Sequence, residues 1–170
     1  MAALVAAASL LGPSIARWTH ARLVEYRINR YTPLIETHAR ANGLSVPLVR
    51  AIIRAESGGR PGAVSARGAK GLMQVMEDAE REVLTARKIP RGDLFNPEYN
   101  IAVGTAYLSR LLRRFGNDPW RAVAAYHAGP TRIEKLARES PGKTGREIVE
   151  TGAPRGTVLY VRAVMERAGE

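Results

Sequence analysis

The sequence predicts an all-α fold built as a single domain. Apolar residues recur at helical spacing in one segment after another, as at Val49, Ile52 and Ile53, which places them on one face of a helix. Helix boundary signals frame these segments, because Asn96-Pro97 reads as a helix start and Asn42-Gly43 as a helix stop. A chain of 170 residues fits one domain, and folding at this size buries roughly 70% of the surface of the unfolded chain.

The N-terminal region begins with a ten-residue apolar run at 2–11, which is too short to span a bilayer because a span takes about 20 residues. It matches the core of a signal peptide, and Ser14-Ile15-Ala16 matches a cleavage site, although no Lys or Arg precedes the run. We predict an export signal or membrane anchor at 1–16. The alternative is that the run forms the first turns of a packed or amphipathic helix.

The remaining elements follow in chain order. The pattern predicts a helical spacer with a narrow apolar face at residues 17–31 and the main domain at residues 32–170. Within that domain Thr32-Pro33 reads as an N-cap with proline at the first helical position. The expected helices are 32–41, 46–56, 77–86, 96–115, 120–128, 133–137 and 158–166. Residues 140–156 are rich in Gly, Pro and Thr and predict an irregular loop, either over a groove or as a plain connector.

Glu56 shares the buried stripe of the helix at 46–56, because it falls seven residues after Val49. Apolar surroundings disfavour the charged form of a carboxyl, so we expect a raised pKa for Glu56 and a proton available near neutral pH. A general acid needs that property. Ser57 and Gly58 then stop the helix, which leaves the acid beside a loop. The alternative is a carboxylate paired with an arginine, or a solvated one.

The amino-acid composition restricts the classes of molecule that this protein is expected to bind. A net charge of +10, from 26 Lys and Arg against 16 Asp and Glu, indicates an anionic partner or surface. The sequence argues against nucleic acid as that partner, because the basic residues are dispersed and aromatic residues make up only 6%. The chain has no cysteine for a disulfide or a thiolate metal site. His20 and His38 stand alone, so we expect no metal and no cofactor.

Four ordered motifs resemble the lytic transglycosylases of the goose-lysozyme-like superfamily and lie within residues 46–164. They are Glu56-Ser57, Ser65 followed by Gly68 to Gln74, Ala125 to Pro130, and Tyr160-Val161. The resemblance implies that residues 32–170 form a lysozyme-like catalytic domain with a central helix and a substrate groove. It also implies peptidoglycan glycan strands as the partner and the periplasm or cell envelope as the location, either exported or N-terminally anchored.

The resemblance assigns roles to individual residues. Glu56 would be the catalytic acid, Tyr160 would hydrogen-bond it, and the substrate contacts would include Ser57, Met73, Gln74, Tyr126, His127 and Tyr160. His127 departs from the family pattern, which has asparagine there. Histidine titrates near neutrality and asparagine does not, so His127 either hydrogen-bonds the sugar, tunes the acid or points outward.

The resemblance also implies a reaction without water, in which the 6-hydroxyl of N-acetylmuramic acid attacks its own anomeric carbon and Glu56 performs both proton transfers. Glycosidases that use water carry a second carboxylate. Glu77 and Asp78 are the nearest candidates, but acidic residues are favoured at a helix start by the helix dipole alone, and goose-type lysozymes have aspartate where this chain has Met76. Two alternatives stay open: a goose-type hydrolase, or a catalytically idle glycan-binding component of a secretion or conjugation assembly.

Overall fold

The computed structural model describes residues 18–87 and 90–169, so the signal or anchor predicted at 1–16 lies outside the described residues. Every element named within the described part is a helix. A helix at 18–29 comes first, followed by α2 (Thr32–Ala41), α3 (Val46–Ser57), α4 (Glu77–Arg87), α5 (Pro97–Arg114), α6 (Pro119–Ala128), α7 (Pro130–Arg138), α8 (Gly145–Gly152) and α9 (Arg155–Ala168). The prediction of an all-α fold is confirmed.

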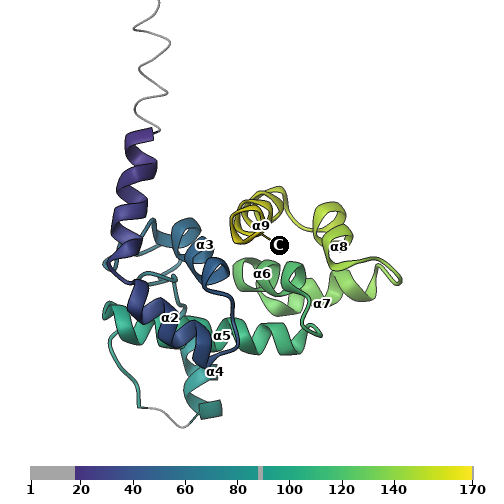
Figure 1. The fold of residues 1–170 in the computed structure, drawn as a ribbon. Helices are drawn as coiled ribbons and strands as arrows, with labels where there is room; N and C mark the ends of the chain where they lie inside the picture. The colour runs from purple at the N-terminus through teal and green to yellow at the C-terminus, as the bar shows by residue number, and fades with distance from the viewer. Residues whose placement is uncertain (1–17, 88–89, 170) are drawn as a thin grey trace, which may run out of the picture.

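The longest of the helices named above, α5, is the central one. Asn96 caps it as predicted, since its side chain accepts a hydrogen bond from the Tyr99 backbone N–H at 3.1 Å and Pro97 occupies the first turn. The buried face of α5 includes Ile101 and Leu108. Helices α2, α4 and α6 all contact α5. In Figure 1, α5 runs below α3 and α6.

Helix α9 packs against α3, and this pairing joins the two halves of the chain. Ile52 and Ile53 of α3 and Val161 and Val164 of α9 are all fully buried in one hydrophobic core. Figure 1 shows α9 between α3 and α8, with α6 below it. The contact places the end of the predicted catalytic helix beside a segment about 100 residues later in the chain.

The loop predicted at 140–156 is wrong over half of its length, because α8 occupies Gly145–Gly152. A capping box starts this helix: the Thr144 hydroxyl accepts from the Glu147 N–H at 3.3 Å, and the Glu147 carboxylate accepts from the Thr144 N–H at 2.8 Å. Ile148 and Val149 then bury its inner face. Thr144 and Glu147 were therefore the sequence signal for the start of α8, but the neighbouring glycines favoured the prediction of a loop.

The start of α2 also differs from the prediction. Thr32 is the first helical residue and not its cap, and the cap position, Tyr31, makes no side-chain capping bond. The Thr32 hydroxyl instead accepts a hydrogen bond from Arg50 Nη1 of α3 at 3.1 Å. The Thr32 hydroxyl oxygen, which was predicted to cap the helix, thus accepts a hydrogen bond from another helix instead.

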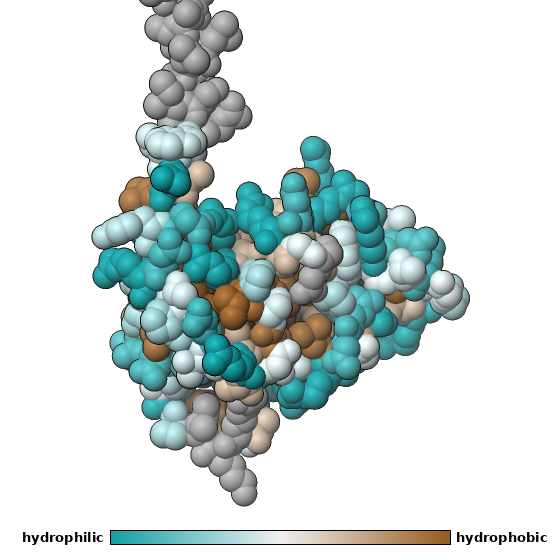
Figure 2. Space-filling model, in the orientation of Figure 1, coloured by the Kyte–Doolittle hydropathy of each residue, from teal (hydrophilic) through white to brown (hydrophobic). Residues whose placement is uncertain are grey.

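The helix at 18–29 ends against the core, where Val24 and Ile28 are buried. No helix among the described residues is both long enough and apolar enough to cross a membrane. On the face drawn in Figure 2, hydrophilic side chains cover most of the outline and hydrophobic ones show mainly near the middle.

Candidate active site

The end of α3 positions Glu56. Gly58 adopts a left-handed conformation with φ of 58° and stops the helix one residue after Ser57. The Ser57 hydroxyl donates to the Ile53 carbonyl at 3.2 Å and accepts from the Gly59 N–H at 3.1 Å. Ser57 is buried, so it fixes the turn that follows Glu56 and does not line the groove described below.

Glu56 meets Tyr160 of α9, whose hydroxyl donates to Glu56 Oε1 at 2.6 Å. Burial raises the pKa of Glu56 from its ordinary value of 4.5 to about 7, and the hydrogen bond from Tyr160 partly opposes that rise. No ion pair joins Glu56 to an arginine within residues 18–87 and 90–169. The carboxyl is therefore protonated in a substantial fraction of molecules at neutral pH.

A groove of about 440 Å³ opens at Glu56. The loop that follows α3 supplies one side of it, and the end of α6 supplies the other. The lining residues are Glu56, Ser65, Arg67, Ala69, Gln74, Val75, Met76, Asp78, Ala79, Tyr107, Ala125, Tyr126, His127, Ala128 and Gly129. Gln74, Tyr126 and His127 thus lie in the same groove as Glu56.

Met73 and Gln74 lie differently with respect to the groove. The Met73 side chain is fully buried, and its carbonyl accepts a hydrogen bond from the Tyr126 hydroxyl at 2.8 Å. Gln74 lines the groove in a left-handed conformation with φ of 49°. Its side-chain Nε2 donates to the carbonyls of Ala63 at 3.1 Å and Gly71 at 3.0 Å. These two hydrogen bonds stabilise the loop that carries Gln74. Gln74 also lines the groove.

Asn100 holds the same loop from below, and sequence reasoning missed it. It is fully buried on α5, accepts from the Met73 N–H at 2.8 Å, and donates from Nδ2 to the carbonyls of Lys70 at 2.9 Å and Leu94 at 2.8 Å. A Cβ at Gly71 would lie 2.2 Å from Asn100 Nδ2, so only glycine fits there. The signal in the sequence was an asparagine beside the apolar stripe of α5.

Two tyrosines form an aromatic wall. The rings of Tyr107 and Tyr126 lie 5.7 Å apart at an angle of 56°. Burial raises the pKa of Tyr126 well above 10, with a further contribution from the nearby Glu56 charge. Tyr126 therefore stays protonated and keeps donating to the Met73 carbonyl. Sequence reasoning did not anticipate Tyr107, since it lies outside the motifs and outside the predicted stripe of α5.

His127 stacks on Tyr160, with ring centroids 4.4 Å apart and an interplanar angle of 28°. Its Nδ1 lies 3.3 Å from the Thr157 hydroxyl. Burial and the positive charge of Arg67 both lower the pKa of His127, so its neutral form dominates at neutral pH. Arg67 also lines the groove. It belongs to none of the four motifs, so sequence reasoning did not predict it as a site residue.

The groove contains one further carboxylate among its lining residues, Asp78. The Asp78 side chain is 89% exposed and lies 3.1 Å from Arg81 Nη1 one turn along α4. It lacks the apolar surroundings that Glu56 has. Within the described part of the chain, no group of three or more His, Asp or Glu side chains is arranged to hold a metal.

Comparisons with known proteins identify related chains. Residues 33–149 match the model of the family described as the transglycosylase SLT domain. The chain is 37% identical over 117 residues to the soluble lytic murein transglycosylase of Salmonella typhimurium, which covers 66% of this chain and 18% of that protein. It is 34% identical over 143 residues to membrane-bound lytic murein transglycosylase C of Photorhabdus laumondii, covering 77% and 40% respectively.

Solved structures give the same result. An inactive mutant of the lytic transglycosylase Slt from Pseudomonas aeruginosa superposes with a TM-score of 0.75 at 32% identity, over 80% of this chain and 23% of that one. A 70-kDa soluble lytic transglycosylase in complex with bulgecin A superposes with a TM-score of 0.78 at 27% identity, over 88% and 29%. The chain spans about a fifth of the length of the soluble relative described above. By its matched residues and its lysozyme-like fold, this chain belongs to the transglycosylase SLT domain family.

Proposed function

We propose that this protein is a peptidoglycan lytic transglycosylase that cleaves the bond between N-acetylmuramic acid and N-acetylglucosamine and leaves 1,6-anhydromuramoyl ends. One observation carries the proposal: Glu56 sits in a groove with its pKa raised to about 7, and Tyr160 orients it through a hydrogen bond of 2.6 Å. Family membership supports the substrate class. The groove supplies an acid that is half protonated at neutral pH.

The proposed reaction uses Glu56 twice. Its proton passes to the glycosidic oxygen of N-acetylglucosamine as the bond from that oxygen to the muramoyl C1 breaks. The Glu56 carboxylate then takes the proton of the muramoyl 6-hydroxyl as that oxygen bonds to C1. Because the attacking oxygen belongs to the same sugar, the step is intramolecular and consumes no water. Glu56 ends the cycle protonated, as it began.

The substrate contacts follow from the lining of the groove. We propose that Gln74, Tyr126 and His127 contact the glycan directly. Ser57 and Met73 contribute by holding the chain around Glu56, because both side chains are buried. We also propose that residues 32–170 act as the catalytic domain, preceded by a helical spacer at 17–31.

The goose-type hydrolase is the rival chemistry, and Asp78 is the carboxylate on which it would depend. A hydrolase needs a base to activate water, and Asp78 is the other acid of the groove. Its exposure and its pairing with Arg81 leave it solvated. The lyase proposal therefore gives Asp78 no role in the reaction.

Digestion of purified sacculi, followed by mass spectrometry of the muropeptides, tests the proposal. We expect products lighter by one water than reducing muropeptides, none of them with Glu56→Gln, and undiminished release with Asp78→Asn. Reducing ends that disappear with Asp78→Asn would show a hydrolase instead. Sacculi binding by the parent chain without any released product would show a glycan-binding protein.

We propose that the protein acts in the cell envelope, where its substrate lies. The relatives include proteins named as soluble and as membrane-bound transglycosylases. The apolar run at 2–11 supports export or anchoring through the N-terminus. Fractionation of cells that carry a tagged chain tests this: recovery with cytoplasmic proteins would contradict it.

A further inference from the structure

A second hollow lies behind the catalytic helix and has no part in the proposed reaction. It measures about 320 Å³ and is lined by Glu25, Pro47, Arg50, Ala51, Arg54 and Arg167. These residues come from the helix at 18–29, from α3 and from α9. We call it the arginine hollow.

The arginine hollow has an excess of positive charge. Arg50 and Arg54, one turn apart on α3, both pair with the single carboxylate of Glu25. Arg50 also donates hydrogen bonds to Asn29 Oδ1 at 2.6 Å and to the Thr32 hydroxyl. Three guanidinium groups thus line the hollow together with one carboxylate.

Arg167 adds a further positive charge to the hollow beside Arg54, which shares the Glu25 carboxylate with Arg50. Burial lowers the pKa of Arg54, and the positive charge of Arg167 lowers it further, so the two cations act on each other. Arg167 Nη1 donates to the Ala163 carbonyl of its own helix at 3.0 Å, and its side chain enters no ion pair within the described residues. Two cations that face one concave space favour an anion that accepts hydrogen bonds from both.

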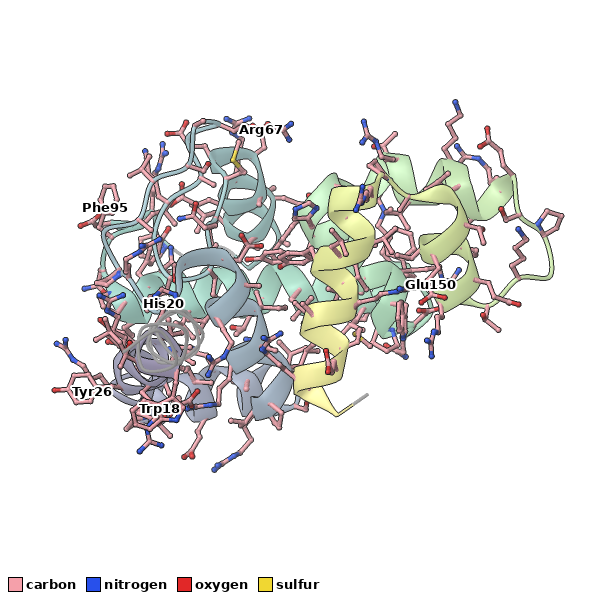
Figure 3. All side chains as sticks on the ribbon, turned by 90° about the horizontal axis from the view of Figure 1, so that it is seen from above. Trp18, His20, Tyr26, Arg67, Phe95 and Glu150 are labelled. Atoms are coloured by element: carbon pink, nitrogen blue, oxygen red, sulfur yellow. The ribbon has the colours of Figure 1, made fainter. Side chains whose placement is uncertain are left out.

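The helix that supplies Glu25 also exposes residues typical of a membrane surface. Trp18, Arg22 and Glu25 fall at i, i+4 and i+7 and so share one stripe, and Arg22 stacks over the Trp18 ring at 5.4 Å. Trp18 and Tyr26 are 63% and 67% exposed. Tryptophan, tyrosine and arginine are enriched where proteins meet lipid headgroups. Figure 3 shows Trp18 and Tyr26 on the opposite side of the molecule from Arg67 of the groove.

We propose that the arginine hollow binds a phosphate group through Arg54 and Arg167, and that the phosphate belongs to an anionic lipid headgroup. A bound phosphate would bridge α3 and α9, the helices that carry Glu56 and Tyr160. The exposed stripe at Trp18 would lie at the lipid surface, while the groove on the other side would remain open to glycan.

Thermal unfolding in inorganic phosphate, against chloride at matched ionic strength, tests for the site itself. At a phosphate concentration a few times Kd we expect the midpoint to rise by about 2–4 °C. Arg167→Ala should abolish the rise. Arg167 is exposed and bonds only to its own helix in the described structure, so this variant should fold normally. Arg132→Ala, which removes an exposed arginine of α7 away from the hollow, is the matched control and should keep the rise.

Co-sedimentation with vesicles distinguishes the two sources of phosphate. We expect binding to vesicles that contain phosphatidylglycerol, little binding to phosphatidylcholine vesicles, and a several-fold loss of binding with Arg167→Ala but not with Arg132→Ala. An equal phosphate response in the parent and in Arg167→Ala would overturn the site. A phosphate response without vesicle binding would overturn the lipid assignment and leave a soluble phosphate ligand.

Discussion

The proton on Glu56 is the residue-scale property on which the proposed activity depends. Its pKa of about 7 arises mainly from burial, and the Tyr160 hydrogen bond opposes that effect because it stabilises the charged form. A buried carboxyl with a perturbed pKa in a groove is the arrangement expected of a general acid. The pH dependence of the reaction and of folding should both report this one group.

Activity should fall as the pH rises through about 7, because the acid form of Glu56 is then lost. Tyr160→Phe removes the hydrogen bond that lowers this pKa, so the alkaline limb should move to higher pH while the maximal rate drops. A full pH profile of muropeptide release measures both changes. Tyr26→Phe, at an exposed position, is the control and should leave the limb in place.

Glu56 should also make the protein less stable at high pH. The pKa is about 7 when folded and near 4.5 when unfolded, so the folded state binds more protons between these values. The free energy of unfolding should therefore fall as the pH rises from 4.5 to 7, by at most about 3 kcal/mol in total. Glu56→Gln, which cannot ionise, should be more stable than the parent at about pH 8 and similar at about pH 4. Urea titrations at both pH values measure this, and an equal effect at both would contradict it.

His127 should be replaceable. The ring stacks on Tyr160, and its lowered pKa keeps it neutral where Glu56 works. We expect His127→Asn to retain activity within about an order of magnitude and to move the acidic limb of the profile to lower pH, since a titrating neighbour is removed. Steady-state rates across pH test this. Loss of all activity would show that the imidazole is indispensable.

At the scale of elements, α5 organises the groove through Asn100. This buried side chain makes three hydrogen bonds to the backbone of the loops at Lys70, Met73 and Leu94. Tyr126 holds the Met73 carbonyl from the other side. The loop that carries Gln74 is thus clamped between two helices, α5 and α6.

The two asparagines at the start of α5 should differ in their contributions. Asn96→Ala removes an N-cap and should cost about 1 kcal/mol of unfolding free energy. Asn100→Ala leaves buried backbone groups unsatisfied and should cost about 3 kcal/mol or more. Equilibrium unfolding in urea compares them. Equal costs would show that the Asn100 clamp is replaced by water or by loop movement.

Sequence reasoning at this scale succeeded where the signal was local. The end of α3 at Gly58 and the Asn96 cap were both predictable, since a left-handed glycine and a capping side chain act within a few residues. It failed at α8, where a capping box was hidden among turn formers. It also failed at Thr32, because Arg50 comes from a different helix.

At the scale of the whole molecule, the net charge of +10 should govern retention on the anionic wall. With Glu56→Gln to prevent digestion, binding to purified sacculi should weaken steadily as salt rises, because the screening length shrinks. Pull-down across a salt series measures this, with duplex DNA as the comparison. Retention on DNA alone would contradict a wall partner.

The sequence by itself determined most of the helices, though not α8, together with the acid on a buried stripe and the ordered motifs that indicate the family. Helix periodicity, caps and each single motif depend on residues only a few positions apart. The resemblance implied that Tyr160 hydrogen-bonds Glu56, and the tertiary structure brings these two residues together across 104 positions of the chain. Only the tertiary structure decided that Asn100 clamps the loop and that Arg54 and Arg167 line one hollow. The physical reason is that such contacts depend on how α3, α5 and α9 pack. Periodicity shows which face of a helix is buried but not which helix covers it.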